Sequence, residues 1–177
     1  MADKDALRAL QTRLAERMQQ VREERPGLSW LAVSCAGLGL LLPLKQAGEI
    51  FDPAIVVPVP HTQSWFSGVI NHRGGICTVV DFAQFLGLRG PDDPLPPGEH
   101  TRLVALNAAL GVNCTLLVDR LEGLRHEADL QRLETDDNAA ARPAFAPARW
   151  RDAAGRAWQE INLAELARQS QFLAIAG

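Results

Sequence analysis

The sequence predicts a mainly β fold built from two small barrel-like lobes. Short apolar runs bounded by Gly, Pro, Asn or Asp recur from residue 28 onward, as in antiparallel sheets and barrels. Two stretches, 80–85 and 161–166, also repeat one pattern: an apolar run ends at Asp or Asn, and Gln or Glu follows three residues later. This pattern typically caps a helix. We therefore expect a short helix to close each lobe.

Residues 1–26 are interpreted as an N-terminal amphipathic helix with a linker, and residues 27–177 as the folded domain. Five apolar residues recur at intervals of three or four and form one stripe along a helix: Leu7, Leu10, Leu14, Met18 and Val21. Pro26 and Gly27 end this helix. The stripe either packs on the domain or docks on another helix, and the sequence leaves both alternatives open.

The first half of the domain predicts two hairpins. One spans residues 28–44 with its turn in the segment AGLG, and the second spans 66–80 with its turn in the polar segment HRGG. Glycines tolerate positive φ, so the chain can reverse in the second turn and leave Arg73 exposed. Asp81 then begins a short helix that ends near Gly87.

The second half repeats this plan after a surface loop at 89–100, which is rich in Pro and Gly. A hairpin is expected over 102–118, and a further strand continues toward Arg125. Residues 127–148 predict a loop that holds at most one short strand. A last strand at 158–161 precedes a helix from Leu163 to about Ser170.

Composition excludes several classes of protein. A net charge of −3 and a pI near 5.8 argue against a nucleic-acid-binding protein, which usually carries a basic face. No apolar stretch reaches the roughly 18 residues of a membrane span, and the polar N-terminus does not resemble a secretory signal. The three cysteines lack metal-ligand spacing. We expect a soluble, cytoplasmic protein without metal, cofactor or direct membrane insertion.

The sequence offers only weak candidates for catalytic residues. Asp81 is better explained as a helix cap, and Asp119 as a ligand of local backbone, so nothing brings these carboxylates together for acid–base work. Cys77 and His72 are hairpin neighbours and could form a nucleophile pair. However, Cys77 lies within an apolar strand, where a thiol stays protonated. A cysteine-dependent enzyme that uses Cys77 is therefore the weakest alternative.

Three motifs carry a resemblance to a known family. The first combines Pro60, GVIN at 68–71, Arg73-Gly74 and Val80-Asp81. The others are LLVDRL at 116–121 and Gly48-Glu49-Ile50. In this order the chain resembles the CheW-like coupling proteins of bacterial chemosensory systems. Its leading helix and C-terminal segment resemble the PilI-type members, which serve systems that control type IV pili and twitching motility.

The resemblance implies a fold of two five-stranded, SH3-like β-barrels that share a core. It also implies a non-enzymatic, cofactor-free adaptor that couples the cytoplasmic tip of a methyl-accepting chemoreceptor to the regulatory domain of a CheA-like histidine kinase. In the family, the groove between the lobes meets the receptor and a face of one lobe meets the kinase. Such a protein is cytoplasmic and joins membrane receptor arrays through its partners.

Three candidate partner-binding residues follow from these motifs. Arg73 presents a planar fork that suits carboxylates or backbone carbonyls of a partner, and the matching family arginine is tied to receptor coupling. Glu49 is either a receptor contact or a partner of Arg73 within the chain. Ile50 follows Glu49 in the same motif and is included with it.

Three further candidates have strong architectural interpretations. Gly68, inside a strand, permits close approach of another backbone segment, and Asn71 can bridge a turn. Trp65 is either an exposed hot spot beside the tip or a core residue. The alternative function is a stand-alone β-barrel module for a small ligand or peptide, which a deep polar pocket between the lobes would indicate.

Overall fold

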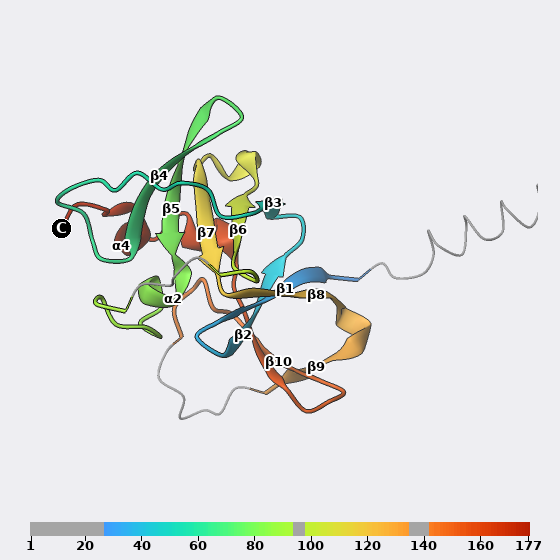
Figure 1. The fold of residues 1–177 in the computed structure, drawn as a ribbon. Coiled ribbons are helices and arrows are strands. Elements are labelled where there is room, and N and C mark those ends of the chain that lie inside the picture. Colours follow the sequence, from blue (N-terminus) through green and yellow to red (C-terminus); the bar gives the residue numbers. More distant parts are fainter. Residues whose placement is uncertain (1–26, 94–97, 135–141) are drawn as a thin grey trace, which may run out of the picture.

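The computed structural model describes residues 27–93, 98–134 and 142–177. The predicted N-terminal helix lies outside these ranges. The described part is mainly β, as predicted, with two sheets that form two lobes (Figure 1).

Sheet A has six strands, one more than the five expected for this lobe. In spatial order they are β8 (Arg120–His126), β1 (Ser29–Cys35), β2 (Leu38–Pro43), β11 (Ala157–Glu160), β10 (Arg149–Asp152) and β9 (Leu130–Leu133). Sheet B has the expected five: β3 (Ala47–Phe51), β6 (Arg102–Leu106), β7 (Cys114–Val118), β5 (Gly75–Asp81) and β4 (Phe66–His72). We call the two units lobe A and lobe B.

The lobes do not correspond to the two halves of the sequence, which corrects the sequence interpretation. The chain begins lobe A with β1 and β2, builds lobe B with β3 to β7, and returns to lobe A with β8 to β11 (Figure 1). Strand β11 pairs in parallel with β2, and β5 pairs in parallel with β7. The pairing of β11 with β2 ties both ends of the domain into lobe A.

The two predicted hairpins of the first half are confirmed, and both reverse through two residues with positive φ. Ala36 and Gly37 have φ of 47° and 82°, and Arg73 and Gly74 have φ of 52° and 81°. Such pairs are typical of two-residue hairpin turns, whose twist matches that of the strands. The first turn is therefore shorter than expected, and β2 already begins at Leu38.

The short capping helices are also confirmed. Asp81 accepts the Gln84 N–H at the start of α2 (Phe82–Phe85), and Asn162 caps α3 (Leu163–Leu166) in the same way. The Gln84 side chain does not accept the Asp81 backbone N–H, which donates to the Trp65 carbonyl at 2.9 Å; the Gln84 side-chain amide donates to the Gly90 carbonyl at 3.0 Å. The helix expected over 163–170 ends already at Leu166, and a separate helix α4 (Ser170–Leu173) begins at Ser170. Two 3₁₀ turns complete the described elements, η1 (Ala108–Leu110) and η2 (Glu127–Asp129).

Two strands were not predicted. Strand β10 is only four residues long and follows an Ala- and Pro-rich stretch. Its short alternation of Arg, Trp, Arg and Asp was therefore not interpreted as a strand. Strand β3 has an exposed middle and a register shift against β6, so it lacks the apolar run of a buried strand. The predicted short strand within 127–148 is β9.

The lobes share a core, as expected. Its largest cluster of buried side chains draws on both sheets and on the capping helices, including Leu31, Leu40, Val104, Leu116, Phe82 and Leu163. A second cluster inside lobe A is built around Trp30, Trp150 and Trp158. The Glu160 carboxylate accepts indole N–H groups from Trp30 and Trp150, at 3.4 and 2.9 Å. Buried aromatic surface thus stabilises lobe A while its polar N–H groups stay paired.

Candidate functional site

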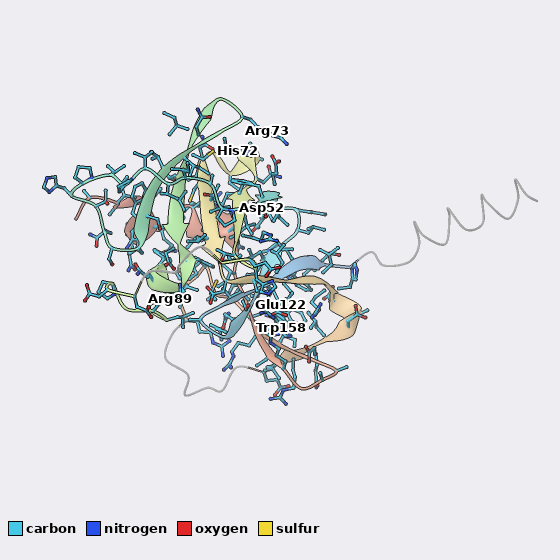
Figure 2. All side chains as sticks on the ribbon, viewed as in Figure 1. Asp52, His72, Arg73, Arg89, Glu122 and Trp158 are labelled. Atoms are coloured by element: carbon cyan, nitrogen blue, oxygen red, sulfur yellow. The ribbon has the colours of Figure 1, made fainter. Side chains whose placement is uncertain are left out.

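The turn between β4 and β5 carries Arg73 at its outermost point. The Arg73 side chain is 75% exposed and projects from the end of the hairpin (Figure 2). The Asn71 side chain accepts the Gly74 N–H at 3.1 Å, so Asn71 bridges the turn as predicted. The turn therefore fixes the backbone of Arg73 while leaving its guanidinium accessible.

Side chains from the two edges of sheet B meet at this turn. Strands β3 and β4 are the outermost strands of the sheet, yet Arg73 Nη2 donates to Glu49 Oε1 at 2.6 Å. His72 Nε2 lies 3.2 Å from Glu49 Oε2, and the His72 ring stacks on Phe51 with centroids 4.0 Å apart. We call Glu49, Phe51, His72 and Arg73 the Arg73 tip.

The Arg73 tip combines a charged outer layer with an aromatic base. Because a carboxylate only accepts hydrogen bonds, His72 must carry its proton on Nε2. Glu49 is thus a partner of Arg73 within the chain, one of its two predicted roles. The sequence indicated His72 only as a possible partner of Cys77, although it lies inside the tip motif, and it did not indicate Phe51.

Ile50 and Gly68 flank this arrangement in different ways. Ile50 follows Glu49 on β3 and is 38% exposed, so its side chain is available to a partner. Gly68 is buried, has φ of 135°, and a Cβ there would lie 2.2 Å from the Val57 carbonyl oxygen. Residues Val57 and Val69 exchange two backbone hydrogen bonds across this close approach. Gly68 therefore has an architectural role, because only a residue without a Cβ lets the backbone around Val57 pack this close to β4.

Of the two alternatives for Trp65, the structure supports the core residue. Trp65 is 7% exposed and belongs to the shared core. Its ring packs edge-on against Phe85 and stacks with Phe172, at centroid distances of 5.2 and 6.3 Å. Trp65 precedes β4 and faces inward because the C-terminal helix α4 covers it, which a local sequence motif does not reveal.

A second ion cluster lies inside the molecule, and it brings Asp81 and Asp119 together against expectation. Arg89 donates to Asp119 at 2.9 and 3.0 Å and to Asp81 at 3.4 Å. Asp119 also accepts the Ala36 N–H at 2.8 Å, so it serves a distant turn rather than local backbone. Burial lowers the pKa of the Arg89 guanidinium, but Asp119 and then Asp81 outweigh it and raise that pKa. We call Arg89, Asp81 and Asp119 the Arg89 cluster.

The Arg89 cluster fits a structural role. Both carboxylates are engaged by one guanidinium, whereas paired-carboxylate catalysis needs groups free to exchange protons with a substrate. The cluster joins α2, the end of β7 and the β1–β2 turn, so it crosses between the lobes. The sequence interpretation placed Arg89 in a surface loop and gave it no partner.

The cysteine alternative gains no geometric support. The Cys77 thiol donates to Asn113 Oδ1 at 3.0 Å, and His72 is engaged by Glu49. Burial raises the pKa of the Cys35 and Cys114 thiols to about 12, with the charge of Asp119 adding to the effect at Cys35. Within the described ranges, no group of three or more His, Cys, Asp or Glu residues could hold a metal ion.

A cavity of about 630 Å³ lies between the C-terminal end of α2 and sheet A. Its floor is formed by apolar side chains such as Leu40, Phe85 and Ile161. This is not the deep polar pocket that the small-ligand alternative predicts.

The match to a known family agrees with the fold. A family model described as the CheW-like domain matches residues 29–171, from the first residue of β1 into α4. The chain belongs to the CheW-like domain family.

Individual relatives cover parts of this CheW-like chain. It is 27% identical to the protein PilI of Pseudomonas aeruginosa over 114 residues, which span 64% of this chain and 61% of PilI. It is 32% identical to the chemotaxis protein CheW of Rhizobium meliloti over 83 residues, which span 47% of this chain and 50% of that protein. The chain thus spans about half to three fifths of the length of these relatives.

A solved structure shows the same fold over most of the chain. The scaffolding protein TtCheW from Thermoanaerobacter tengcongensis superposes with a TM-score of 0.67 at 18% identity, covering 84% of this chain and 93% of that one. This likeness confirms the SH3-like barrel fold.

One of the proteins with a similar sequence is an enzyme. A porphobilinogen deaminase of Acidothermus cellulolyticus is 32% identical over 96 residues, but these span only 28% of that enzyme. The family match across residues 29–171 covers far more of this chain than that partial match does of the enzyme. Among the described helices, none is long and apolar enough to cross a bilayer.

Proposed function

We propose that this protein is a non-enzymatic adaptor of a chemosensory array. It binds the cytoplasmic tip of a chemoreceptor and the regulatory domain of a CheA-type histidine kinase, and so couples one to the other. The observation that carries this proposal is the CheW-like match across residues 29–171, because CheW-like proteins couple such receptors and kinases.

The Arg73 tip is the proposed receptor contact. Its guanidinium offers several N–H donors, and the bond to Glu49 uses one of its two terminal nitrogens. The remaining donors can take a carboxylate or carbonyl of the receptor, while Glu49 fixes the direction of the fork. Ile50 adds exposed apolar surface beside the charged groups. Asn71 and Gly68 support this surface through the backbone, and buried Trp65 supports it only through the core.

Weak individual contacts are sufficient for this role. An exposed ion pair contributes about 0–1 kcal/mol, so a single tip contact gives little affinity. When receptor, adaptor and kinase repeat in an array, each bound contact raises the effective concentration of the next. We infer that the protein is cytoplasmic and reaches the membrane through these partners.

The finer proposal is that the array controls type IV pili and twitching motility. Its support is the similarity to PilI over 114 residues. Deleting the gene and scoring twitching and swimming separately tests the output. Loss of twitching with intact swimming is expected, and the reverse result would reassign the protein to a swimming system.

The adaptor proposal is tested by titrating the full chain with the regulatory domain of the CheA-type kinase from its own genome. Saturable micromolar binding is expected, and failure to bind any such domain would leave only the fold in common with the CheW-like proteins.

For the receptor contact, receptor binding by Arg73→Glu is compared with receptor binding by Arg168→Glu. Arg168 is a matched control, since its side chain is 74% exposed and it pairs with one glutamate, at 3.2 Å. Only the first variant should weaken receptor binding.

A further inference from the structure

The cavity beside α2 is a groove with an apolar floor and an accessible rim. Its volume of about 630 Å³ falls within the range of about 300–1,000 Å³ that is typical of binding clefts. Leu40, Phe85 and Ile161 form the floor and are buried, whereas Leu38 and Leu88 on the rim are 36% and 40% exposed. We call this feature the α2 groove.

Two arginines give the α2 groove its charge. Arg142 is half-buried and Arg149, at the start of β10, is exposed; both line the groove. Counting only the described residues, neither has a carboxylate partner. By contrast, five other arginines of the described ranges form ion pairs with carboxylates: Arg73, Arg89, Arg102, Arg156 and Arg168. Two guanidinium groups beside an apolar floor favour a ligand with carboxylates next to apolar side chains.

We propose that the α2 groove docks an acidic amphipathic segment of a partner protein. Its apolar side chains pack on Leu40, Phe85 and Ile161, and its carboxylates pair with Arg142 and Arg149. This is the helix-in-groove mode, in which apolar anchors supply affinity and flanking charges set the orientation. The proposal does not depend on the adaptor assignment.

The α2 groove and the Arg73 tip lie at opposite ends of the same hairpin strand. The tip precedes β5, whereas α2 follows it directly, and Figure 2 shows Arg73 far from Arg89 beside α2. A segment bound in the groove therefore leaves the tip accessible. The chain can hold two partners at once.

The N-terminal segment of the chain is a poorer occupant on charge grounds. It has six basic and five acidic residues: Lys4, Arg8, Arg13, Arg17, Arg22 and Arg25 against Asp3, Asp5, Glu16, Glu23 and Glu24. This composition lacks the negative charge that two unpaired arginines favour. A partner with net negative charge fits better.

A synthetic helical peptide tests the proposal on the full chain. The probe is a fluorescein-labelled 18-residue peptide with Leu at intervals of three and four and Glu at the flanking positions. Its matched control has Lys in place of each Glu. Fluorescence anisotropy should show saturable binding of the acidic peptide and binding at least about tenfold weaker for the basic one, since like charges then meet the arginines. No binding, or equal binding of both peptides, would overturn the proposal.

Variants locate the binding site. The double variant Arg142→Glu/Arg149→Glu should bind the acidic peptide about tenfold more weakly, because two attractions become repulsions. Arg151→Glu is the control, since Arg151 is exposed on β10 but does not line the groove. An equal loss in Arg151→Glu would point to general electrostatics and contradict the site. Sedimentation of the wild-type chain and of the double variant tests whether a second copy occupies the groove instead. Self-association of the wild type that the double variant abolishes would assign the groove to a second copy.

Discussion

Two arginines of this molecule each bind carboxylates, but in opposite surroundings. The Arg89 side chain is 10% exposed and joins Asp81 and Asp119, whereas the Arg73 side chain is 75% exposed and joins Glu49. A buried charge left without its partner is costly, whereas an exposed pair contributes little. Removal of one member of the Arg89 cluster should therefore destabilise the fold, whereas the Arg73 guanidinium stays accessible to solvent.

The two salt bridges therefore have different roles in this molecule. At Arg89, the bonds satisfy charges that folding has removed from water. At Arg73, the bond to Glu49 orients a group that remains solvated and open to a partner. Substitutions at the two sites should therefore differ in which property they change, stability or binding.

The largest expected effect is that of Arg89→Met. Removing the guanidinium leaves Asp81 and Asp119 close together and partly or fully buried, so the free energy of unfolding should fall by about 3 kcal/mol. Urea unfolding of the full chain measures this change. Arg168→Met is the control and should change stability by less than about 0.5 kcal/mol. Equal effects of the two variants on the free energy of unfolding would contradict the claim that the buried ion pairs matter more for stability than the exposed one.

Gly68→Ala should rank second. A Cβ at residue 68 would lie 2.2 Å from the Val57 carbonyl oxygen at a φ of 135°, so we expect a loss of about 2 kcal/mol. Gly90→Ala is a suitable control, because a Cβ there meets nothing within 4 Å. If Gly68→Ala retains wild-type stability, the covering segment around Val57 is not held as described.

Asp152→Asn should have a smaller, pH-dependent effect. The indole N–H of Trp158 is the main cause that lowers the pKa of Asp152, and two backbone N–H groups assist it. A carboxyl whose folded pKa lies below its unfolded value stabilises the fold above about pH 4 and loses that contribution as the pH falls further. The variant should thus cost less than about 1 kcal/mol at pH 7. In thermal unfolding, its difference from wild type should shrink below pH 4; a difference that grows there would contradict the sign.

Arg73→Glu should change stability least. Its side chain is mostly exposed and loses one surface ion pair, so urea unfolding should shift by less than about 1 kcal/mol. A loss as large as that of Arg89→Met would make Arg73 a structural residue.

The sequence predicted the local features of this fold well. The hairpin turns at Gly37 and Gly74 and the caps at Asp81 and Asn162 depend on neighbouring residues, and all are confirmed. It could not predict that β11 pairs with β2, because that pairing joins residues about 120 positions apart. The two lobes were for this reason assigned to the wrong parts of the chain.

The site shows the same limit. The motif indicated Arg73, Glu49 and Asn71, and the structure places all three at one tip. His72 and Phe51 meet only because the two edges of sheet B approach each other, which spacing along the chain does not reveal. The two alternatives for Trp65 stayed open and the Arg89 cluster was missed for the corresponding reason: α4 and Asp119 contact them from distant positions.

The most direct test of the central claim is receptor-dependent kinase activation by wild type, Arg73→Glu and Arg168→Glu in a reconstituted receptor–kinase mixture. We expect wild type and Arg168→Glu to activate the kinase equally and Arg73→Glu to lose receptor-dependent activation while remaining folded. Normal activation by Arg73→Glu would contradict the assignment of the Arg73 tip to receptor coupling.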